Sequence, residues 1–151
     1  MTTIVCDRSV MAADSRCTVG DVYFPTQKVW VLPGVILGVA GSGRAMSRTL
    51  QWFIDGMPKA KPDIEKGSFT GLLLTRDGIF MVDETCFIEP IKRPFHAIGT
   101  GAGPAIAAMM CGKRPADAAE IACQIDPSTG GPVRVYRLSD APPRPRSKRK
   151  V

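Results

Sequence analysis

The order of apolar segments in this sequence predicts an α+β fold in which helices cover the outer faces of packed sheets. Strand-like apolar runs fill the first forty residues, a helical pattern follows, and the second half repeats strands, then helices, then a closing strand. With 151 residues, 44% of them hydrophobic, the chain has enough apolar mass for one domain with a core of its own.

Short apolar runs separated by turn residues predict about five strands before Gly41. These expected strands cover residues 3–6, 10–13, 19–23, 28–32 and 35–39. Asp7-Arg8-Ser9 predicts a tight first hairpin, and Pro33-Gly34 is a turn dipeptide. The apolar runs are nearly continuous rather than alternating, which indicates sheets covered on both faces.

After Gly41 the period changes, because apolar residues recur at three- and four-residue steps over residues 45–57 and predict an amphipathic helix. A polar connector over 59–68 follows, and Arg76-Asp77-Gly78 is expected to be a hairpin turn. The remaining expected elements are strands at 69–74, 79–82 and 85–88, helices at 105–110 and 116–125, and a last strand at 133–138.

The net charge of +6 belongs to the carboxyl-terminal end. Five basic residues follow Pro142, which leaves 15 basic against 14 acidic residues in 1–141. We therefore divide the chain into a domain at 1–140 and a basic, Pro-rich tail at 141–151 that is predicted to be disordered. The tail's charges could bind phosphates or an acidic patch on a neighbouring subunit, and the absence of interleaved aromatic residues favours the second, so nucleic-acid binding is not expected.

The cysteine and histidine content argues against a metal site or a disulfide framework. Five cysteines without CxxC spacing and a single histidine support neither. The longest apolar run, 29–41, is broken by Pro33-Gly34 and is too short to cross a bilayer, and the first residues lack a signal-peptide pattern. We expect a cytoplasmic protein with no metal and no cofactor.

Thr2 is the candidate nucleophile, because removal of Met1 would expose it as an amino-terminal threonine. An α-amine has an ordinary pKa of about 7.7–8.0 and can accept the hydroxyl proton near neutral pH. Nucleophile and general base would then belong to one residue. Met-Thr-Thr is also a common start, so this feature alone does not establish a catalyst.

Several segments in order resemble proteasome β-subunits and the HslV peptidase, over about 135 residues. The resemblance lies in Thr2-Thr3-Ile4-Val5, Ala12-Ala13-Asp14-Ser15-Arg16, Thr18-Val19-Gly20, Gln27-Lys28-Val29, Gly38-Val39-Ala40-Gly41-Ser42-Gly43, Ala97-Ile98-Gly99-Thr100-Gly101 and Asp126-Pro127-Ser128-Thr129-Gly130-Gly131. It implies a four-layer αββα sandwich of the amino-terminal-nucleophile (Ntn) hydrolase type.

The resemblance also implies a role for each matching residue. Thr2 would be the nucleophile, Lys28 the ammonium beside it, and Asp14 the carboxylate that pairs with and orients that lysine. Gly41 would supply the N–H that stabilises the oxyanion. Asp126 and Thr129 would lie near the amino terminus, and so would Thr100, which stands where the family usually has serine.

By the same resemblance, the chain would be a threonine endopeptidase acting inside a homo-oligomeric ring. Unfolded polypeptide would be its substrate and an ATP-dependent unfoldase a partner. The chain departs from the family in having room for one helix, not two, between Gly41 and the next strand, so one outer layer is expected to be reduced. Two alternatives stay open, namely a catalytically silent ring or scaffold protein and an amidohydrolase acting on a small amide.

Overall fold

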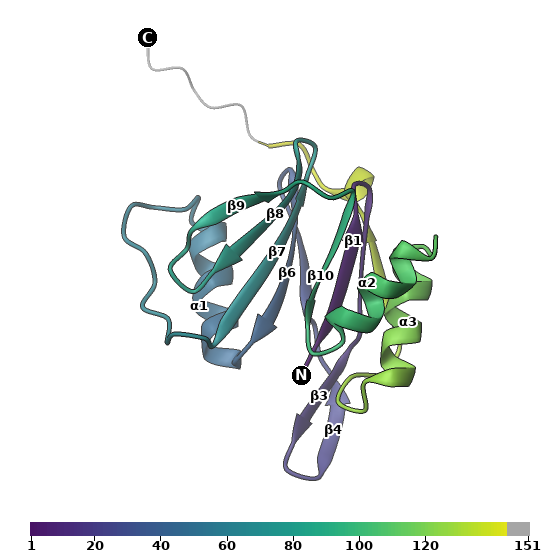
Figure 1. Cartoon of the computed structure of the whole chain (residues 1–151). Coiled ribbons are helices and arrows are strands. Elements are labelled where there is room, and N and C mark those ends of the chain that lie inside the picture. The colour runs from purple at the N-terminus through teal and green to yellow at the C-terminus, as the bar shows by residue number, and fades with distance from the viewer. Residues whose placement is uncertain (145–151) are drawn as a thin grey trace.

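The computed structural model describes residues 1–144, which form two stacked β-sheets with helices on both outer faces (Figure 1). Residues 145–151, which include most of the predicted tail, lie outside the described residues. The α+β class predicted from the sequence is confirmed.

The first sheet is antiparallel and has the strand order β10-β1-β2-β11. Its strands are β10 (Phe95–Gly99), β1 (Thr3–Asp7), β2 (Val10–Ala13) and β11 (Arg134–Arg137). Its outer face packs against α2 (Ala102–Met110) and α3 (Pro115–Ile125), whose alanines form a close-packed layer with Val5 and Ala12. Small residues suit this layer because they let helix and sheet backbones approach closely.

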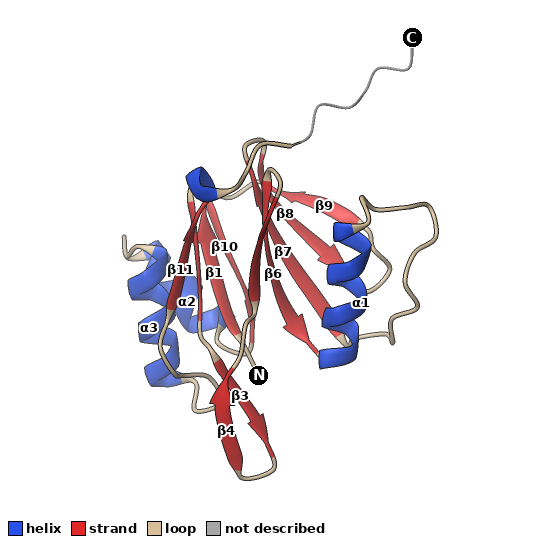
Figure 2. Ribbon diagram, turned by 180° about the vertical axis from the view of Figure 1, so that it is seen from behind, coloured by secondary structure: helices blue, strands red, loops and turns tan. Residues whose placement is uncertain are grey.

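The second sheet has the strand order β5-β6-β7-β8-β9, also antiparallel. Its strands are β5 (Val29–Leu32), β6 (Val35–Gly41), β7 (Phe69–Thr75), β8 (Gly78–Asp83) and β9 (Ile88–Ile91). The single helix α1 (Gly43–Ile54) covers its outer face (Figure 2). Ser42 caps α1, its hydroxyl accepting a hydrogen bond from the Ala45 N–H at 3.3 Å.

The main hydrophobic core lies between the two sheets, where fully buried aliphatic side chains from both meet, among them Ile4, Met11, Ile36 and Leu72. Gly38 on β6 is required there, because a Cβ would lie 2.8 Å from both Ile4 and Met11 side-chain atoms. β1 and β6 are therefore held face to face, which fixes the two strands whose ends form the candidate site.

A separate hairpin, β3 (Arg16–Val19) and β4 (Val22–Pro25), projects from the sheets at the end where the chain begins (Figure 1). The prediction of one strand over 19–23 was wrong, because Gly20 adopts φ +58 and begins a turn that reverses the chain. Four large apolar side chains on this hairpin are exposed, those of Val19, Val22, Tyr23 and Phe24.

Other predicted boundaries also needed correction. The strand expected at 85–88 begins only at Ile88, because Asp83 organises residues 83–87 into a turn by accepting hydrogen bonds from the backbones of Thr85 and Phe87. Strand β10 was not predicted as an element. The first hairpin, the Arg76–Gly78 turn and a single helix between Gly41 and Phe69 are confirmed, although that helix spans 43–54 rather than 45–57.

The strands place their connections at two ends. The turns between β1 and β2, β5 and β6, and β7 and β8 lie at one end, with Pro142–Arg144 beside them, and we call it the turn end (Figure 1). The amino terminus lies at the opposite end, and we call that the amino-terminal end. A short 3-10 helix, η1 (Leu138–Asp140), leads from β11 toward the turn end.

Among the described residues, no helix is long and apolar enough to cross a membrane. In the same part of the chain, no group of three or more His, Cys, Asp or Glu side chains is placed to hold a metal ion.

Candidate active site

A buried ion pair is the centre of the candidate site. The Lys28 ammonium lies 2.8 Å and 3.0 Å from the two carboxylate oxygens of Asp14, and both side chains are almost fully buried. Asp14 directly follows β2 and Lys28 directly precedes β5, so the pair joins the two sheets at the amino-terminal end. Among the described residues it is the only ion pair.

The Asp14 carboxylate is fully satisfied by its neighbours. Besides Lys28, it accepts hydrogen bonds from the backbone N–H groups of Thr3 at 2.9 Å, Gly130 at 3.1 Å and Arg16 at 3.2 Å. Charge-assisted bonds of this kind offset the cost of burying the two charges. Asp14 thereby fixes the start of β1, the hairpin base and the loop after α3 relative to one another.

Lys28 also reaches the beginning of the chain, because its ammonium donates a hydrogen bond to the Met1 carbonyl oxygen at 2.8 Å. The Met1 carbonyl carbon is bonded to the Thr2 nitrogen, so this contact places the ammonium beside the atom that would become the α-amine of Thr2. Met1 is 67% exposed, whereas Thr2 is 7% exposed. Met1 thus projects into solvent while Thr2 lies within the site.

The segment after β10 holds the Thr2 backbone. The Thr2 carbonyl accepts hydrogen bonds from Gly101 N–H at 3.3 Å and from the Thr100 hydroxyl at 3.5 Å. Gly99 has φ +92, and a Cβ there would collide with the Thr2 carbonyl. A Cβ on Gly101 would collide with the Thr3 hydroxyl. Glycine at both positions is therefore a requirement of this close approach.

Asp126 and Thr129 lie in the loop that begins where α3 ends. Asp126 accepts a hydrogen bond from the Thr100 hydroxyl at 2.5 Å and one from Ser128 N–H at 2.9 Å. The buried Thr129 hydroxyl accepts a hydrogen bond from the Thr3 hydroxyl at 3.2 Å. This loop is thus connected to the first residues of the chain through two hydroxyl groups.

The electrostatics of the loop agree with its position beside the chain's beginning. Burial raises the pKa of Asp126, but hydrogen bonds from Thr100 and Ser128 and the nearby amino-terminal charge outweigh that effect, so its pKa lies below the ordinary 3.8. Asp126 is therefore an anion near neutral pH, facing the positive amino terminus.

Gly41 ends β6 at the same end of the molecule. The Lys28 carbonyl accepts a hydrogen bond from Val39 N–H at 2.9 Å. Gly41 follows Val39 by two residues on the same strand. With φ +153, and because a Cβ would collide with the Ser68 carbonyl, the position requires glycine. Ser42 N–H donates to the same carbonyl at 3.0 Å.

The structure thus brings six of the seven sequence-predicted residues into one connected network, namely Thr2, Asp14, Lys28, Thr100, Asp126 and Thr129. Gly41 lies on β6 two residues beyond Val39, whose N–H donates to the Lys28 carbonyl. All but Thr129, which lies within the loop after α3, are at or next to the end of a strand or helix, where antiparallel pairing gathers residues that are far apart in the sequence.

Three residues with positioning contacts were missed by the sequence reasoning. Thr3 is fully buried and bonds both Asp14 and Thr129. Arg16 donates to the Pro127 carbonyl at 3.2 Å and stacks over the Tyr23 ring at 4.7 Å. Burial raises the pKa of Cys123, partly offset by a hydrogen bond with Thr129. Only the Thr2-Thr3 repeat was a signal, since it places a second hydroxyl one residue after the nucleophile.

The arrangement can perform one type of chemistry without a metal. A hydroxyl at Thr2 would lie beside a fixed ammonium, and an amine released at the same residue would lie near two carboxylates and that ammonium. These are the components of nucleophilic attack by an amino-terminal residue.

The fold is that of the proteasome-like Ntn hydrolases, a class in which solved structures match this chain over nearly its full length. No family model matches the chain, and no curated protein matches it by sequence.

Three of these structures show the extent of the likeness. BPH from Thiobacillus denitrificans, in complex with epoxomicin, has a TM-score of 0.69 and 16% identity, covering 90% of this chain and 96% of its own. HslV from Trypanosoma brucei has a TM-score of 0.67 and 18% identity, with coverages of 90% and 98%. A mutant of Anbu from Hyphomicrobium sp. strain MC1 has a TM-score of 0.65 and 15% identity, with coverages of 93% and 89%.

Proposed function

We propose that this chain is a threonine endopeptidase whose nucleophile is Thr2, exposed by removal of Met1. The observation that carries the proposal is the contact of the buried Lys28–Asp14 pair with the Met1–Thr2 peptide group. A buried charge pair is costly to build, and this one is directed at the one threonine that can acquire a free amine.

The first step needs a deprotonated hydroxyl and a neutral amine. After Met1 is removed, the Lys28 ammonium loses the acceptor that it now contacts and faces the new α-amine. A nearby positive charge disfavours protonation of the amine and favours ionisation of the hydroxyl. The Thr2 amine then takes the hydroxyl proton, directly or through a water, while Asp14 keeps the ammonium in position.

The second step is acyl transfer. The Thr2 hydroxyl oxygen attacks the peptide carbonyl carbon, and the Gly41 N–H stabilises the resulting oxyanion. Collapse breaks the C–N bond, the departing amine takes its proton from the Thr2 ammonium, and an ester remains on Thr2. Water, deprotonated by the same amine, hydrolyses that ester and restores the hydroxyl.

The loops from β10 and α3 would serve this chemistry as supports. The Gly101 N–H holds the Thr2 carbonyl, with the Thr100 hydroxyl 3.5 Å from the same oxygen, and the Asp126 carboxylate accepts the stronger hydrogen bond from the Thr100 hydroxyl at 2.5 Å. We assign Thr100, Asp126 and Thr129 to orienting the amino terminus rather than to contact with the peptide.

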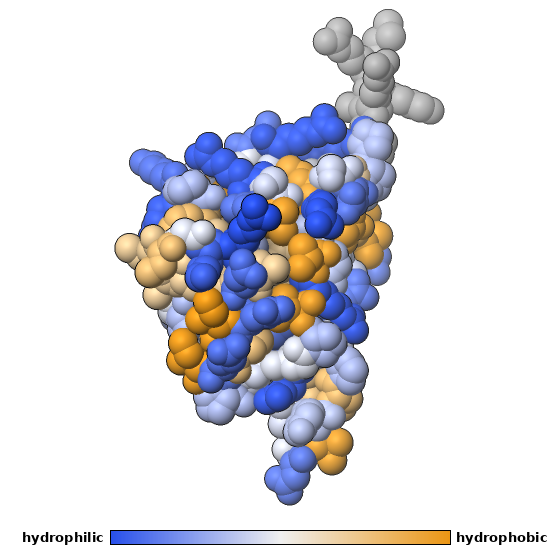
Figure 3. All heavy atoms as spheres, turned by 90° about the vertical axis from the view of Figure 1, so that its right-hand side faces the viewer, coloured by the Kyte–Doolittle hydropathy of each residue, from blue (hydrophilic) through white to orange (hydrophobic). Residues whose placement is uncertain are grey.

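We propose further that copies of the chain assemble into a closed ring whose chamber receives unfolded polypeptide, with an ATP-dependent unfoldase as a partner. The exposed apolar hairpin β3–β4 supports self-association, because an isolated two-stranded ribbon with four exposed apolar side chains gains stability by being covered. Figure 3 shows apolar atoms at the projecting end where this hairpin lies. The αββα sandwich would have one reduced outer layer, formed by α1 alone.

Peptide turnover by three forms of the chain tests the enzymatic proposal. Wild-type protein should hydrolyse fluorogenic peptides, Thr2→Ser should retain activity because it keeps a hydroxyl and an amine, and Thr2→Ala should lose it. Ser47→Ala is the matched control, because it removes an exposed hydroxyl on α1, outside the site. Equal turnover by wild type and Thr2→Ala would exclude Thr2 as nucleophile.

The same assay, together with the oligomeric state and the intact mass of the chain, separates the two alternatives. Assembly without turnover and with Met1 retained would indicate a scaffold protein. Turnover of small non-peptide amides by a monomer, without peptide hydrolysis, would indicate an amidohydrolase.

A further inference from the structure

The turn end, opposite the candidate active site, carries a cluster of exposed basic side chains. We call Arg8, Arg76, Lys92, Arg93 and Arg144 the basic rim. They come from segments that are far apart in the sequence, namely the β1–β2 turn, the β7–β8 turn, the β9–β10 connection and the chain after η1. None of them belongs to an ion pair among the described residues.

Two cavities open within this rim, and both are lined by Thr75, Arg76 and Asp77. One of about 340 Å³ lies between the β7–β8 turn and residues 141–144. The other, of about 210 Å³, is bounded by Arg8, Lys92 and β9. The cavities share the β7–β8 turn as a common wall, so one extended ligand could place side chains in both.

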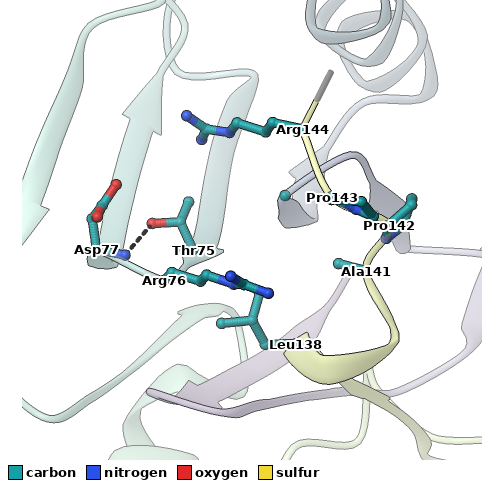
Figure 4. A pocket seen from close by; sticks show the side chains of 9 residues that line it. Thr75, Arg76, Asp77, Leu138, Ala141, Pro142, Pro143 and Arg144 are labelled. Carbon is teal, nitrogen blue, oxygen red and sulfur yellow. Dashed lines mark hydrogen bonds between the residues drawn. The ribbon is translucent and has the colours of Figure 1, made fainter. Parts of the chain in front are cut away.

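The charged lining of the cavities is unbalanced, with four cations, Arg8, Arg76, Lys92 and Arg144, against the one carboxylate of Asp77. Figure 4 shows Arg76 and Arg144 extending into the larger cavity from opposite sides, with the Asp77 carboxylate directed away from it. Other carboxylates on the segments around the rim are the exposed Glu89 on β9, next to the lining residue Pro90, and Asp7 and Asp140. Asp7 accepts three hydrogen bonds from Ser9 and Val10, and Asp140 accepts one from Ser139.

Four further basic residues, Arg146, Lys148, Arg149 and Lys150, follow Arg144 in the sequence and lie outside the described residues.

We propose that the basic rim binds an acidic segment of a partner polypeptide, with Glu or Asp side chains entering the two cavities. Guanidinium groups pair well with carboxylates, and the two cavities share the β7–β8 turn as a wall, so successive acidic side chains of one extended peptide could enter both. A nucleic acid fits less well, because the only aromatic residue lining either cavity is the half-buried Phe80, which leaves no exposed ring for stacking on bases.

Fluorescence anisotropy with the full chain tests this proposal. The probes are a labelled Glu-rich peptide, the same peptide with Gln in place of Glu, and a single-stranded oligonucleotide of equal charge. We expect saturable binding of the Glu-rich peptide that weakens with added salt, and weaker binding of the other two.

The variant that tests the rim combines Arg8→Gln, Arg76→Gln and Lys92→Gln, all at exposed positions. Loss of three exposed charge contacts should weaken binding about tenfold. The matched control combines Lys59→Gln, Lys66→Gln and Lys113→Gln, which removes the same charge from exposed sites elsewhere and should bind as wild type does.

Three results would overturn the proposal. Equal weakening in both triple variants would mean that only net charge acts. Tighter binding of the oligonucleotide would assign the rim to nucleic acid. A chain ending at Arg144 that loses all binding, while the rim variant keeps it, would assign binding to residues 145–151 alone.

Discussion

The Asp14 carboxylate is the residue-scale feature on which the candidate site depends most. It accepts hydrogen bonds from four donors and neutralises a buried ammonium, so its removal leaves Lys28 as an uncompensated buried charge. We therefore expect its removal to lower stability and, under the proposed mechanism, peptide turnover.

Asp14→Asn should lower the free energy of unfolding by about 3–5 kcal/mol, the usual effect of breaking a buried ion pair from one side. Urea denaturation followed by circular dichroism measures it. The double variant Asp14→Asn, Lys28→Met should lose less than the sum of the two single losses, because it leaves no unpaired charge. Additive losses in this cycle would show that the pair does not couple.

The substitution Thr3→Val tests the role of the buried Thr3 hydroxyl. The change keeps the shape of the side chain and removes the hydroxyl that bonds Thr129, so we expect a stability loss of about 1 kcal/mol. We also expect kcat to fall with KM unchanged, because Thr3 orients Thr2 and does not contact the peptide. Thr3→Ser should restore kcat. A rise in KM alone would assign Thr3 to substrate binding.

The residues of the site were predictable from sequence to different degrees. Thr2, Asp14 and Lys28 occur in segments with a recognisable pattern, and the structure brings them together. Cys123 carried no local signal, and the motif that contains Arg16 did not indicate its contacts with Tyr23 and Pro127. These residues become neighbours of Arg16 only when the β3–β4 hairpin forms and the loop after α3 reaches the hairpin base.

At the scale of elements, the projecting hairpin β3–β4 makes the clearest prediction. Val19 and Val22 face each other across the two strands and are 64% and 66% exposed. If the hairpin is covered by a second copy, Val19→Ser with Val22→Ser should shift the sedimentation coefficient toward that of the monomer. Ile54→Ser with Phe87→Ser, which changes apolar residues of similar exposure elsewhere, should leave the assembly intact. An unchanged assembly in the hairpin variant would exclude this surface.

His96 on strand β10 makes the folding stability depend on pH. Burial and the Arg93 charge hold the pKa of His96 below 6.5, and its Nδ1 atom is buried without a hydrogen-bond partner. The unfolded chain therefore binds a proton first as the pH falls, so stability decreases below about pH 6.5 and levels off once the folded form is also protonated.

The melting temperature measured at about pH 7.5 and pH 5.5 tests this contribution. The decrease on acidification should be smaller in His96→Gln than in the wild type, since glutamine does not titrate. A decrease of equal size in both proteins would assign the effect to other groups.

The elements missed from the sequence share one physical cause. The hairpin β3–β4 was predicted as a single strand because Val19 and Val22–Tyr23 lie close on either side of Gly20-Asp21, and Phe95–Gly99 was not recognised as a strand. In neither segment does the local order of apolar and polar residues indicate the strand that forms. Strand β10 is defined by pairing with β1 across ninety residues of chain, information that local periodicity does not contain.

At the scale of the whole molecule, the two proposed sites lie at opposite ends of the chain's fold. The candidate peptidase site lies at the amino-terminal end, and the basic rim lies at the turn end, so partner binding and chemistry need not compete for one surface (Figure 2). The α+β class and the strand–helix–strand order were predictable because the spacing of apolar residues indicates which faces of each strand or helix are covered. The family resemblance led us to expect Thr2, Lys28 and Asp126 close together, whereas the strand pairing and hydrogen bonds that hold them at one end are seen only in the structure.

Intact-mass spectrometry after incubation with epoxomicin shows whether Thr2 becomes a free amino-terminal nucleophile. We expect a chain that lacks Met1 and carries one inhibitor, with fragmentation placing the adduct on Thr2 and with no adduct on Thr2→Ala. A chain that retains Met1 and carries no adduct would exclude Thr2 as the nucleophile.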